Sequence, residues 1–540
     1  MLRGKQVNGA DGELRRSFPS VMAATASGLL LAAAFPPLEW AEAAWIAWIP
    51  LLLVCPRSSP RNAFRLGLLA GAIFWLCTLF WLTHVTWPGW ILLSLYCALF
   101  MAGFTYAAAW LMREWGTERF GATFGLMLVL PLVWVGLEYL RCVLFTGFAW
   151  NPLGGSQYAN INLIQIAAWT GVYGVSALIM LLNLALGLTL NHYIRQGLRG
   201  RPAWHPELMI GFLVLALALW TGNRVVAQDR HTVSVRTAVV QPNIPQYEKW
   251  TKDFVDTIYE RLSSLTRMAI HAGAPDMVIW PETAVPDYVR QSRRSSELVR
   301  DMARLGAPIL VGSMDIEWVE EGHARYYNSS ILFDRDGAPV EVYDKQHLVM
   351  FGEYIPLRRF LPFLTAMTPI EESFDAGAES TVFSLEEPAV SFSVLICFED
   401  TVARLARRAV RKGARLLVNQ TNDAWFEESI AAWQHMTHSV FRAVENRTPI
   451  VRAANTGVSC GIDAHGRIHD LLVDVDGNTF IKGFGIVNSR APAEDRAWTF
   501  YTRHGDLFAW TGLIAVVSLL GAAWRRARQA AVEARTEGST

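Results

Sequence analysis

Three side chains that together could make and break an acyl bond stand where strand-like runs end. They are Glu282 in a Trp-Pro-Glu-Thr sequence, Lys345 in a Tyr-Asp-Lys-Gln-His sequence, and Cys397 in an Ile-Cys-Phe-Glu-Asp sequence. Chemistry in α/β proteins is expected at such strand ends. A carboxylate, an amine and a thiol are the parts of a general base, an oxyanion stabiliser and a nucleophile.

Each of these residues also has a purely structural interpretation. A cysteine is often a buried core residue, and Cys397 taken alone is more often inert than catalytic. A glutamate after proline can cap the next helix, and a lysine after aspartate can be a solvated surface charge. The order of the three residues and their flanking sequences therefore decide between the two interpretations.

In that order and with those flanks, the three residues resemble the Glu-Lys-Cys triad of the nitrilase, or carbon–nitrogen hydrolase, superfamily. The similarity extends to Val240–Ile244, Tyr327–Ser329, Phe351–Glu353 and Asn419–Phe426. With apolar segments on both sides, the whole chain resembles the apolipoprotein N-acyltransferase family of bacterial inner membranes. The resemblance implies transfer of an acyl chain from a phospholipid to the α-amino group of the N-terminal diacylglyceryl-cysteine of an apolipoprotein.

The resemblance also implies roles for individual residues. Glu282 would be the general base, Lys345 the oxyanion stabiliser, and Cys397 the nucleophile that carries the acyl group as a thioester between two half-reactions. The other residues that match are Glu353 and Glu399 as supporting acids, and Trp250, Phe398 and Asn328 at the substrate. Some relatives have a tyrosine in place of Phe398, so a hydroxyl contact is lost there. No cofactor, metal or nucleic acid is implied, and the enzyme is expected to act as a monomer.

Two details of the site have open alternatives. Glu399 and Asp400 are close to Cys397 in sequence and should raise the pKa of its thiol, so a cation and a base are needed to oppose them. His435 and His438 are three residues apart on a predicted helix, as zinc ligands can be, but no companion ligands accompany them. We interpret the two histidines as a coincidence of the helix face.

A membrane-anchored amidase with the same triad is the alternative function. It would complete the reaction with water instead of an amine.

Residues 226–505 must position these side chains, and their pattern predicts an α/β domain with largely buried strands. The nitrilase resemblance implies an αββα sandwich. The predicted strands are Val233–Val240, Met277–Trp280, Ile309–Gly312, Ser329–Phe333, Ser391–Ile396, Leu416–Asn419 and Ile450–Ala454. The predicted helices are Phe254–His271, Ser295–Leu305, Ala403–Lys412 and Ala431–Val444.

The remainder of the chain predicts a helical membrane domain. The composition, 52% hydrophobic and 18% charged, is too apolar for an ordinary soluble enzyme, and the 48 basic and 48 acidic residues cancel. A spanning helix needs about 20 apolar residues. Eight spans are predicted: Val21–Pro36, Ala41–Cys55, two within Leu66–Met112, Phe120–Leu137, about Leu163–Leu190, Leu208–Asn223 and Leu507–Trp524.

Arginines in the short loops predict the orientation of these spans. With the N-terminus in the cytoplasm, nearly all of the short-loop arginines lie on the cytoplasmic side. The chain is then organised as a seven-span domain over 1–225, a periplasmic catalytic domain over 226–505, and a last span with a cytoplasmic tail over 506–540. The expected location is the bacterial inner membrane.

One apolar segment of the catalytic domain invites a separate prediction. Met350–Ile370 contains several large apolar residues together with Arg358 and Arg359. It is either a satellite of the core or a mobile arm that dips into the outer leaflet and guides the acyl chain to Cys397.

Overall fold

The computed structural model describes residues 8–196, 205–228, 231–320, 323–355, 373–494 and 496–537. The chain divides into two compact units. One is helical and comprises Met1–Gln157, Thr170–Gly222 and Asp506–Thr540. The other comprises Tyr158–Trp169 and Asn223–Gly505 and contains both β-sheets. The apolar segment Met350–Ile370 lies outside the described residues from position 356 onward, so the arm stays a prediction.

The helical unit is built from long apolar helices. Its helices are α1 (Asn8–Ala33), α2 (Ile49–Val54), α3 (Pro60–Thr78), α4 (Trp87–Trp115), α5 (Phe120–Val143), α8 (Val172–Gln196), α9 (Pro206–Val226) and α15 (Leu507–Glu537). Within the described parts of the chain, five stretches are long and apolar enough to cross a membrane: Trp87–Trp115, Phe120–Thr146, Val172–Arg195, Pro206–Val226 and Leu507–Gln529. These five agree with predicted spans.

The span predicted over residues 41–55 does not form as a continuous helix, and the one predicted at about 163–190 is shorter than expected. Residues 41–55 contain a 3₁₀ helix at Ala41–Trp45 and then the six-residue α2, in which Pro50 occupies the first turn. Proline is favoured in the first turn of a helix, because it has no N–H to donate and its ring crowds the preceding turn. The run predicted at about 163–190 is divided into α6 (Ile161–Ile164), α7 (Ala167–Thr170) and α8. Gly171, with φ of 65°, separates α7 from α8.

Helices α5 and α15 approach one another closely enough that only glycine fits at the crossing. A Cβ atom added to Gly136 would lie 2.3 Å from the backbone oxygen of Gly512. A Cβ atom on Gly512 would lie 2.6 Å from the backbone nitrogen of Gly136. Small residues at such contacts let two helices in a membrane pack backbone against backbone.

The α/β unit contains a seven-stranded and a six-stranded sheet. The larger sheet consists of β1 (Thr232–Gln241), β2 (Met277–Ile279), β3 (Val285–Tyr288), β4 (Ile309–Glu320), β5 (His323–Phe333), β6 (Pro339–Asp344) and β13 (Gly483–Pro492). The smaller sheet consists of β7 (Phe383–Leu385), β8 (Val390–Ile396), β9 (Leu416–Thr421), β10 (Ile450–Ala454), β11 (Cys460–Ile462) and β12 (Ile468–His469). Strands β8, β9 and β10 are parallel neighbours, while β1 pairs with β13 in the antiparallel sense.

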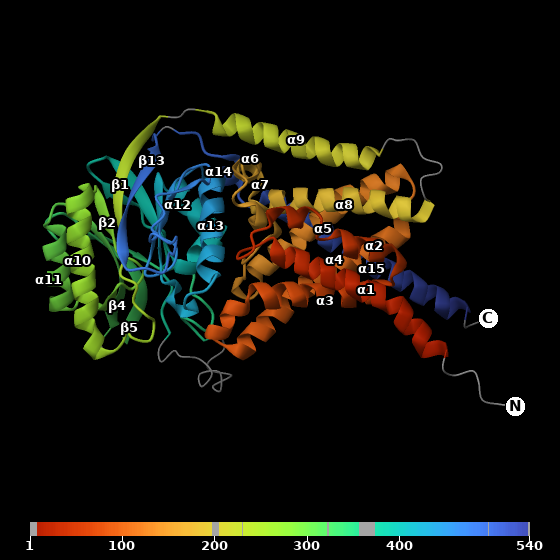
Figure 1. Ribbon diagram of the computed structural model, residues 1–540, viewed down its shortest axis with the longest axis horizontal. Coiled ribbons are helices and arrows are strands. Elements are labelled where there is room, and N and C mark those ends of the chain that lie inside the picture. The colour runs from red at the N-terminus through yellow and green to blue at the C-terminus, as the bar shows by residue number, and fades with distance from the viewer. Residues whose placement is uncertain are drawn as a thin grey trace. The chain divides into compact units, whose positions relative to one another are not determined.

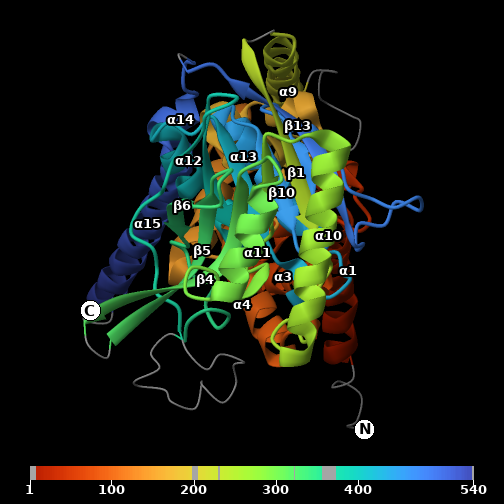
Figure 2. The same ribbon diagram turned by 90° about the vertical axis from the view of Figure 1, so that its left-hand side faces the viewer.

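Alternation of side chains along the strands makes this unit a four-layer αββα sandwich, as expected. Val235 and Val239 of β1 pack between the two sheets, whereas Ala238 and Val240 face the helices on the outside. Those outer helices are α10 (Val255–Gly273) and α11 (Arg293–Ala303), and Figure 2 looks onto them. On the other sheet pack α12 (Ala403–Arg411) and α13 (Ala431–Asn446) (Figure 1). The predicted strands and helices of this unit are confirmed, with shifts at their ends.

Candidate active site

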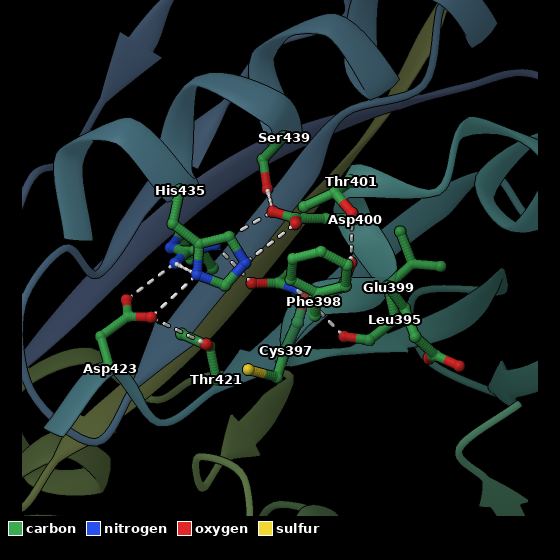
Figure 3. Close-up of polar contacts among 12 residues, drawn as sticks. Leu395, Cys397, Phe398, Glu399, Asp400, Thr401, Thr421, Asp423, His435 and Ser439 are labelled. Carbon is green, nitrogen blue, oxygen red and sulfur yellow. Dashed lines mark hydrogen bonds and ion pairs between the residues drawn. The ribbon is translucent and has the colours of Figure 1, made fainter. Parts of the chain in front are cut away.

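Cys397 stands at the junction between a strand and a short helix. It directly follows β8 and begins a 3₁₀ helix, Cys397–Thr401, with its backbone in the left-handed region at φ of 51°. A residue other than glycine occupies this region only when its surroundings hold it there. Here the side-chain amide of Asn419 donates to the backbone oxygens of Leu395 and Cys397, at 3.1 Å in both cases. The nucleophile candidate therefore sits on a fixed turn, and Figure 3 shows it there.

A buried network joins Lys345 to two carboxylates. The Nζ atom of Lys345, directly after β6, lies 3.2 Å from Oε1 of Glu282 and 2.9 Å from Oε1 of Glu353. Asn328 of β5 donates through Nδ2 to the same two oxygens, at 2.8 and 3.0 Å. The backbone N–H of Val349 donates to the other oxygen of Glu353 at 2.9 Å. Strand β5, the segment after β2 and the loop after β6 thus bring four of the predicted site residues into a single hydrogen-bonded group.

The charges in this group act on the pKa values of Lys345 and Cys397. Burial by itself lowers the pKa of Lys345, but the carboxylates of Glu353 and Glu282 outweigh it, so the pKa is well above its ordinary value. Burial raises the pKa of Cys397 well above its ordinary value, Glu282 raises it further, and Lys345 lowers it. The resting cysteine is therefore a neutral thiol beside a cation, and a reaction at its sulfur would need a base to remove the proton.

Glu399 contacts the backbone and not the thiol. Its Oε1 accepts the N–H groups of Gln346 and His347, at 2.7 and 3.0 Å. Its Oε2 accepts the N–H of Ile396 and the hydroxyl of Tyr343, both at 2.8 Å. Glu399 thus ties the segment that carries Lys345 to the turn that carries Cys397.

This arrangement corrects one expectation about the thiol. Glu399 and Asp400 are not the carboxylates that most raise the pKa of Cys397; Glu282 and Asp423 have the larger influence. The reason is geometric. The oxygens of Glu399 are turned to amide hydrogens, and Asp400 is paired with Arg452 and His435.

The two aromatic residues expected at the substrate are partly exposed. Trp250 is 48% exposed, and the ammonium of Lys249 lies 5.9 Å from the centre of its ring. Phe398 stacks on the ring of His347, with centroids 6.1 Å apart and planes 14° apart. Both present apolar surface that a lipid chain could contact.

Lys249 is buried within this site, although its sequence context did not indicate a role there. Its ammonium donates to the backbone oxygen of Glu282 at 3.2 Å and to the hydroxyl of Thr283 at 2.6 Å. Burial lowers its pKa to about 8, while Glu282 and Cys397 act in the opposite direction. A lysine beside an exposed tryptophan carries no local signal of burial, so the sequence alone could not single it out.

His435 has buried charged partners that its spacing from His438 did not indicate. Its Nδ1 lies 2.8 Å from Asp423 and its Nε2 lies 3.0 Å from Asp400, and all three residues are buried. The histidine therefore belongs to an ion-pair cluster behind Cys397.

Comparisons with known proteins match both parts of the chain. A family model described as the apolipoprotein N-acyltransferase N-terminal domain matches residues 27–185, and one described as carbon–nitrogen hydrolase matches residues 236–483. An apolipoprotein N-acyltransferase of Geobacter metallireducens is 38% identical over 518 residues, which cover 93% of this chain and 95% of that protein. One of Chlorobaculum tepidum is 30% identical over 535 residues, covering 93% and 96%.

Among solved structures, Nit3 of Saccharomyces cerevisiae, a member of branch 10 of the nitrilase superfamily, is similar to part of the chain. It is 19% identical, with a TM-score of 0.35, and the match covers 47% of this chain and 89% of Nit3.

Proposed function

The chain belongs to the apolipoprotein N-acyltransferase family, and on that premise we propose its donor, its acceptor and its mechanism. It is a membrane enzyme with N-acyltransferase activity. The donor is a phospholipid of the surrounding bilayer. The acceptor is the α-amino group of the N-terminal diacylglyceryl-cysteine of an apolipoprotein.

In the first half-reaction, Cys397 attacks the ester carbonyl of the phospholipid. Glu282 takes the thiol proton as the sulfur–carbon bond forms, and Lys345 stabilises the negative oxygen of the tetrahedral intermediate. The intermediate collapses when the ester bond breaks, and Glu282 returns the proton to the departing alcohol of the lysophospholipid. The acyl chain remains on Cys397 as a thioester.

In the second half-reaction, the amine of the apolipoprotein attacks the thioester. Glu282 accepts a proton from the nitrogen, and Lys345 again stabilises the oxyanion. The sulfur leaves, an amide bond remains on the product, and the proton returns from Glu282 to Cys397. One chain contains all of these groups, and we propose that the enzyme acts as a monomer.

The position of the Lys345 ammonium carries this proposal. It lies within 3.2 Å of Glu282 and 2.9 Å of Glu353, and it lowers the pKa of the neighbouring thiol. Two carboxylates keep the lysine charged through both half-reactions, whichever of them holds the proton. This supports a fixed cation as the oxyanion stabiliser and a separate carboxylate as the base.

Mass measurement tests the mechanism. Phospholipid alone should leave the enzyme heavier by one acyl group, and neutral hydroxylamine should remove that group. Cys397→Ala should never gain the mass, whereas Cys460→Ala should behave like the wild type. An acyl group attached at another residue would end the assignment of the nucleophile.

The same experiment separates transfer from hydrolysis. Addition of a diacylated lipopeptide should move the acyl mass from the enzyme to the peptide. Release of free fatty acid with no gain of peptide mass would favour the alternative, a membrane-anchored nitrilase-type amidase that finishes with water.

We further propose that residues 226–505 face the periplasm, between a membrane domain over 1–225 and a last span with a cytoplasmic tail over 506–540. The arginines of the short loops support this orientation. Reporter fusions at Thr251 and after Arg528 should then report opposite compartments. The same compartment for both fusions would overturn the proposal.

A further inference from the structure

A cluster of four charged side chains lies behind the Cys397 turn. The two carboxylates are Asp400 and Asp423, the two cations are His435 and Arg452, and each is at most 1% exposed. His435 lies between the carboxylates, as Figure 3 shows, and Arg452 contacts Asp400 at 3.1 Å and Asp423 at 2.9 Å. Burial alone lowers the pKa of His435, but Asp400 and Asp423 raise it to about 9 against the effect of Arg452. At neutral pH the cluster therefore holds two positive and two negative charges.

The cluster reaches the backbone of the nucleophile through Asn419. Arg452 donates to the side-chain oxygen of Asn419 at 2.6 Å. The amide group of Asn419 then donates to the backbone oxygen of Cys397 at 3.1 Å. This chain of contacts orients the Asn419 side chain so that it supports the left-handed turn.

The cluster reaches the sulfur through Thr421, the last residue of β9. Figure 3 shows the Cys397 sulfur pointing toward Thr421, and the polar side chain of Thr421 lowers the pKa of the thiol. The same hydroxyl also lies 3.4 Å from Oδ1 of Asp423. A hydroxyl has one hydrogen, so it can donate to the sulfur or to the carboxylate, but not fully to both.

The contacts of Asp423 decide which partner receives that hydrogen. Its Oδ1 already lies 2.8 Å from Nδ1 of His435, and its Oδ2 accepts Arg452 at 2.9 Å. Both contacts are shorter than the 3.4 Å contact with Thr421, and both involve a cation, which makes them the stronger bonds. Asp423 is therefore satisfied without Thr421.

We propose that Thr421 is a further catalytic residue, whose hydroxyl donates to the Cys397 sulfur when the thiolate forms, and that His435 is a positioning residue that leaves this hydroxyl available by occupying Asp423. The inference rests on Cys397 as the nucleophile of the proposed function. Thr421 does not transfer a proton. The thiol proton moves to Glu282, and the hydroxyl of Thr421 only donates a hydrogen bond. A thiolate that accepts this hydrogen bond is stabilised relative to the neutral thiol.

Alkylation of Cys397 by iodoacetamide tests the inference without any lipid substrate. The rate is measured by peptide mass at several pH values, on the full-length enzyme in detergent. Thr421→Val removes the hydroxyl and nearly keeps the shape. It should slow alkylation about tenfold near neutral pH and raise the pH midpoint by about one unit. Thr421→Ser keeps the hydroxyl and should follow the wild type. The charged groups that act on the sulfur are unchanged in both variants; they are Glu282, Lys345, Lys249, Asp423 and Arg452.

Thr237→Val is the matched control. Thr237 is also fully buried in a strand, and its hydroxyl makes one 3.4 Å hydrogen bond, to the backbone oxygen of Val487. This variant should leave the alkylation profile unchanged. If Thr421→Val reacted like the wild type, or if Thr421→Ser were as slow as Thr421→Val, the role of the hydroxyl would be refuted.

A double variant tests the role of His435. His435→Gln should also raise the midpoint, because the freed oxygen of Asp423 attracts the Thr421 hydrogen. When Thr421→Val is added, the alkylation rate should fall no further than in the slower single variant, since both changes remove the same bond. If the two substitutions slowed alkylation independently, so that their effects on the rate multiplied, His435 would not act through Thr421. If Thr421→Val changed the alkylation profile as predicted but phospholipid formed no thioester on the wild type, the role of Thr421 would be supported and the proposed function would be rejected.

Discussion

The buried ammonium of Lys249 donates to the backbone oxygen of Glu282 over 3.2 Å, so a second lysine holds the segment that carries the proposed base. Both residues are less than one-tenth exposed, and the same ammonium holds the hydroxyl of the next residue, Thr283. The position of the Glu282 carboxylate therefore depends on a charge that comes from the loop bearing Trp250.

Replacement of Lys249 by methionine should slow acyl transfer about tenfold, because a hydrogen bond to a charged group is worth about 1.5 to 3 kcal/mol and only part of it acts in the transition state. The measurement is kcat for lipopeptide acylation. Lys412→Met, which removes a lysine paired with the exposed Glu379, should leave kcat unchanged. An unchanged kcat in Lys249→Met would show that Glu282 is held without Lys249.

Glu282 and Glu353 should respond differently to the same substitution, although both contact Lys345. Glu282→Gln removes the base and should reduce the single-turnover rate of enzyme acylation by at least about 100-fold. Glu353→Gln should reduce the rate about tenfold and shift the alkaline limb of the pH profile to lower pH, because Glu353 helps to raise the pKa of Lys345. Equal losses with no shift of the limb would contradict the assignment of base and supporting acid.

Glu399 should matter for stability more than Tyr343 does. The two carboxylate oxygens of Glu399 accept four hydrogen bonds, and Glu399→Gln leaves only one oxygen to accept them. The buried donors that lose their acceptor should lower the free energy of unfolding by about 2 to 4 kcal/mol. Tyr343→Phe removes a single donor and should cost about 1 kcal/mol. Thermal unfolding in one detergent gives the order directly, and a lower Tm for Tyr343→Phe than for Glu399→Gln would disprove it.

His435 should make the stability of the enzyme depend on pH. Its pKa is raised from 6.5 to about 9 in the folded chain. The folded state then binds the proton more tightly, so the stabilisation is fully present below pH 6.5 and is lost as the pH rises through about 9. The free energy of unfolding of the wild type minus that of His435→Gln should shrink by roughly 3 kcal/mol over this window.

Asp400, Asp423 and Arg452 face His435 and keep their charges over that range, since the pKa values of both aspartates are lowered and that of Arg452 is raised. Chemical denaturation at several pH values measures the difference. A difference that stays constant between pH 6.5 and 9 would mean that His435 is not the titrating group.

Local sequence patterns predicted the residues at strand ends but not the partners behind them. Cys397 directly follows the apolar residues Val394–Ile396 that end β8, so its place at a strand end could be read from neighbouring residues. Asp423 and Arg452 lie near Asp400 only because β8, β9 and β10 are adjacent and parallel. That order is a property of the whole sheet, and a single sequence contains no local signal for it.

The same limit applies to the elements that were wrong or missed. Strand β13 pairs with β1 from the far end of the domain, so its partner could not be inferred from spacing. In the helical unit, apolar content alone predicted a span over residues 41–55, whereas the backbone forms two short helical pieces there. Mean hydropathy measures how apolar a stretch is, but it does not indicate where a proline begins a new helix.

The contact between Gly136 and Gly512 also fixes the order in which the membrane part can be completed. Helix α5 is synthesised long before α15, and the entire α/β unit is translated between them. The glycine face of α5 consequently remains uncovered during most of translation, and it can be closed only after the ribosome has finished the last helix. The bundle is therefore assembled from both ends of the chain, and a message truncated before codon 512 yields a protein whose first helices are all present but whose α5 has no partner at Gly136.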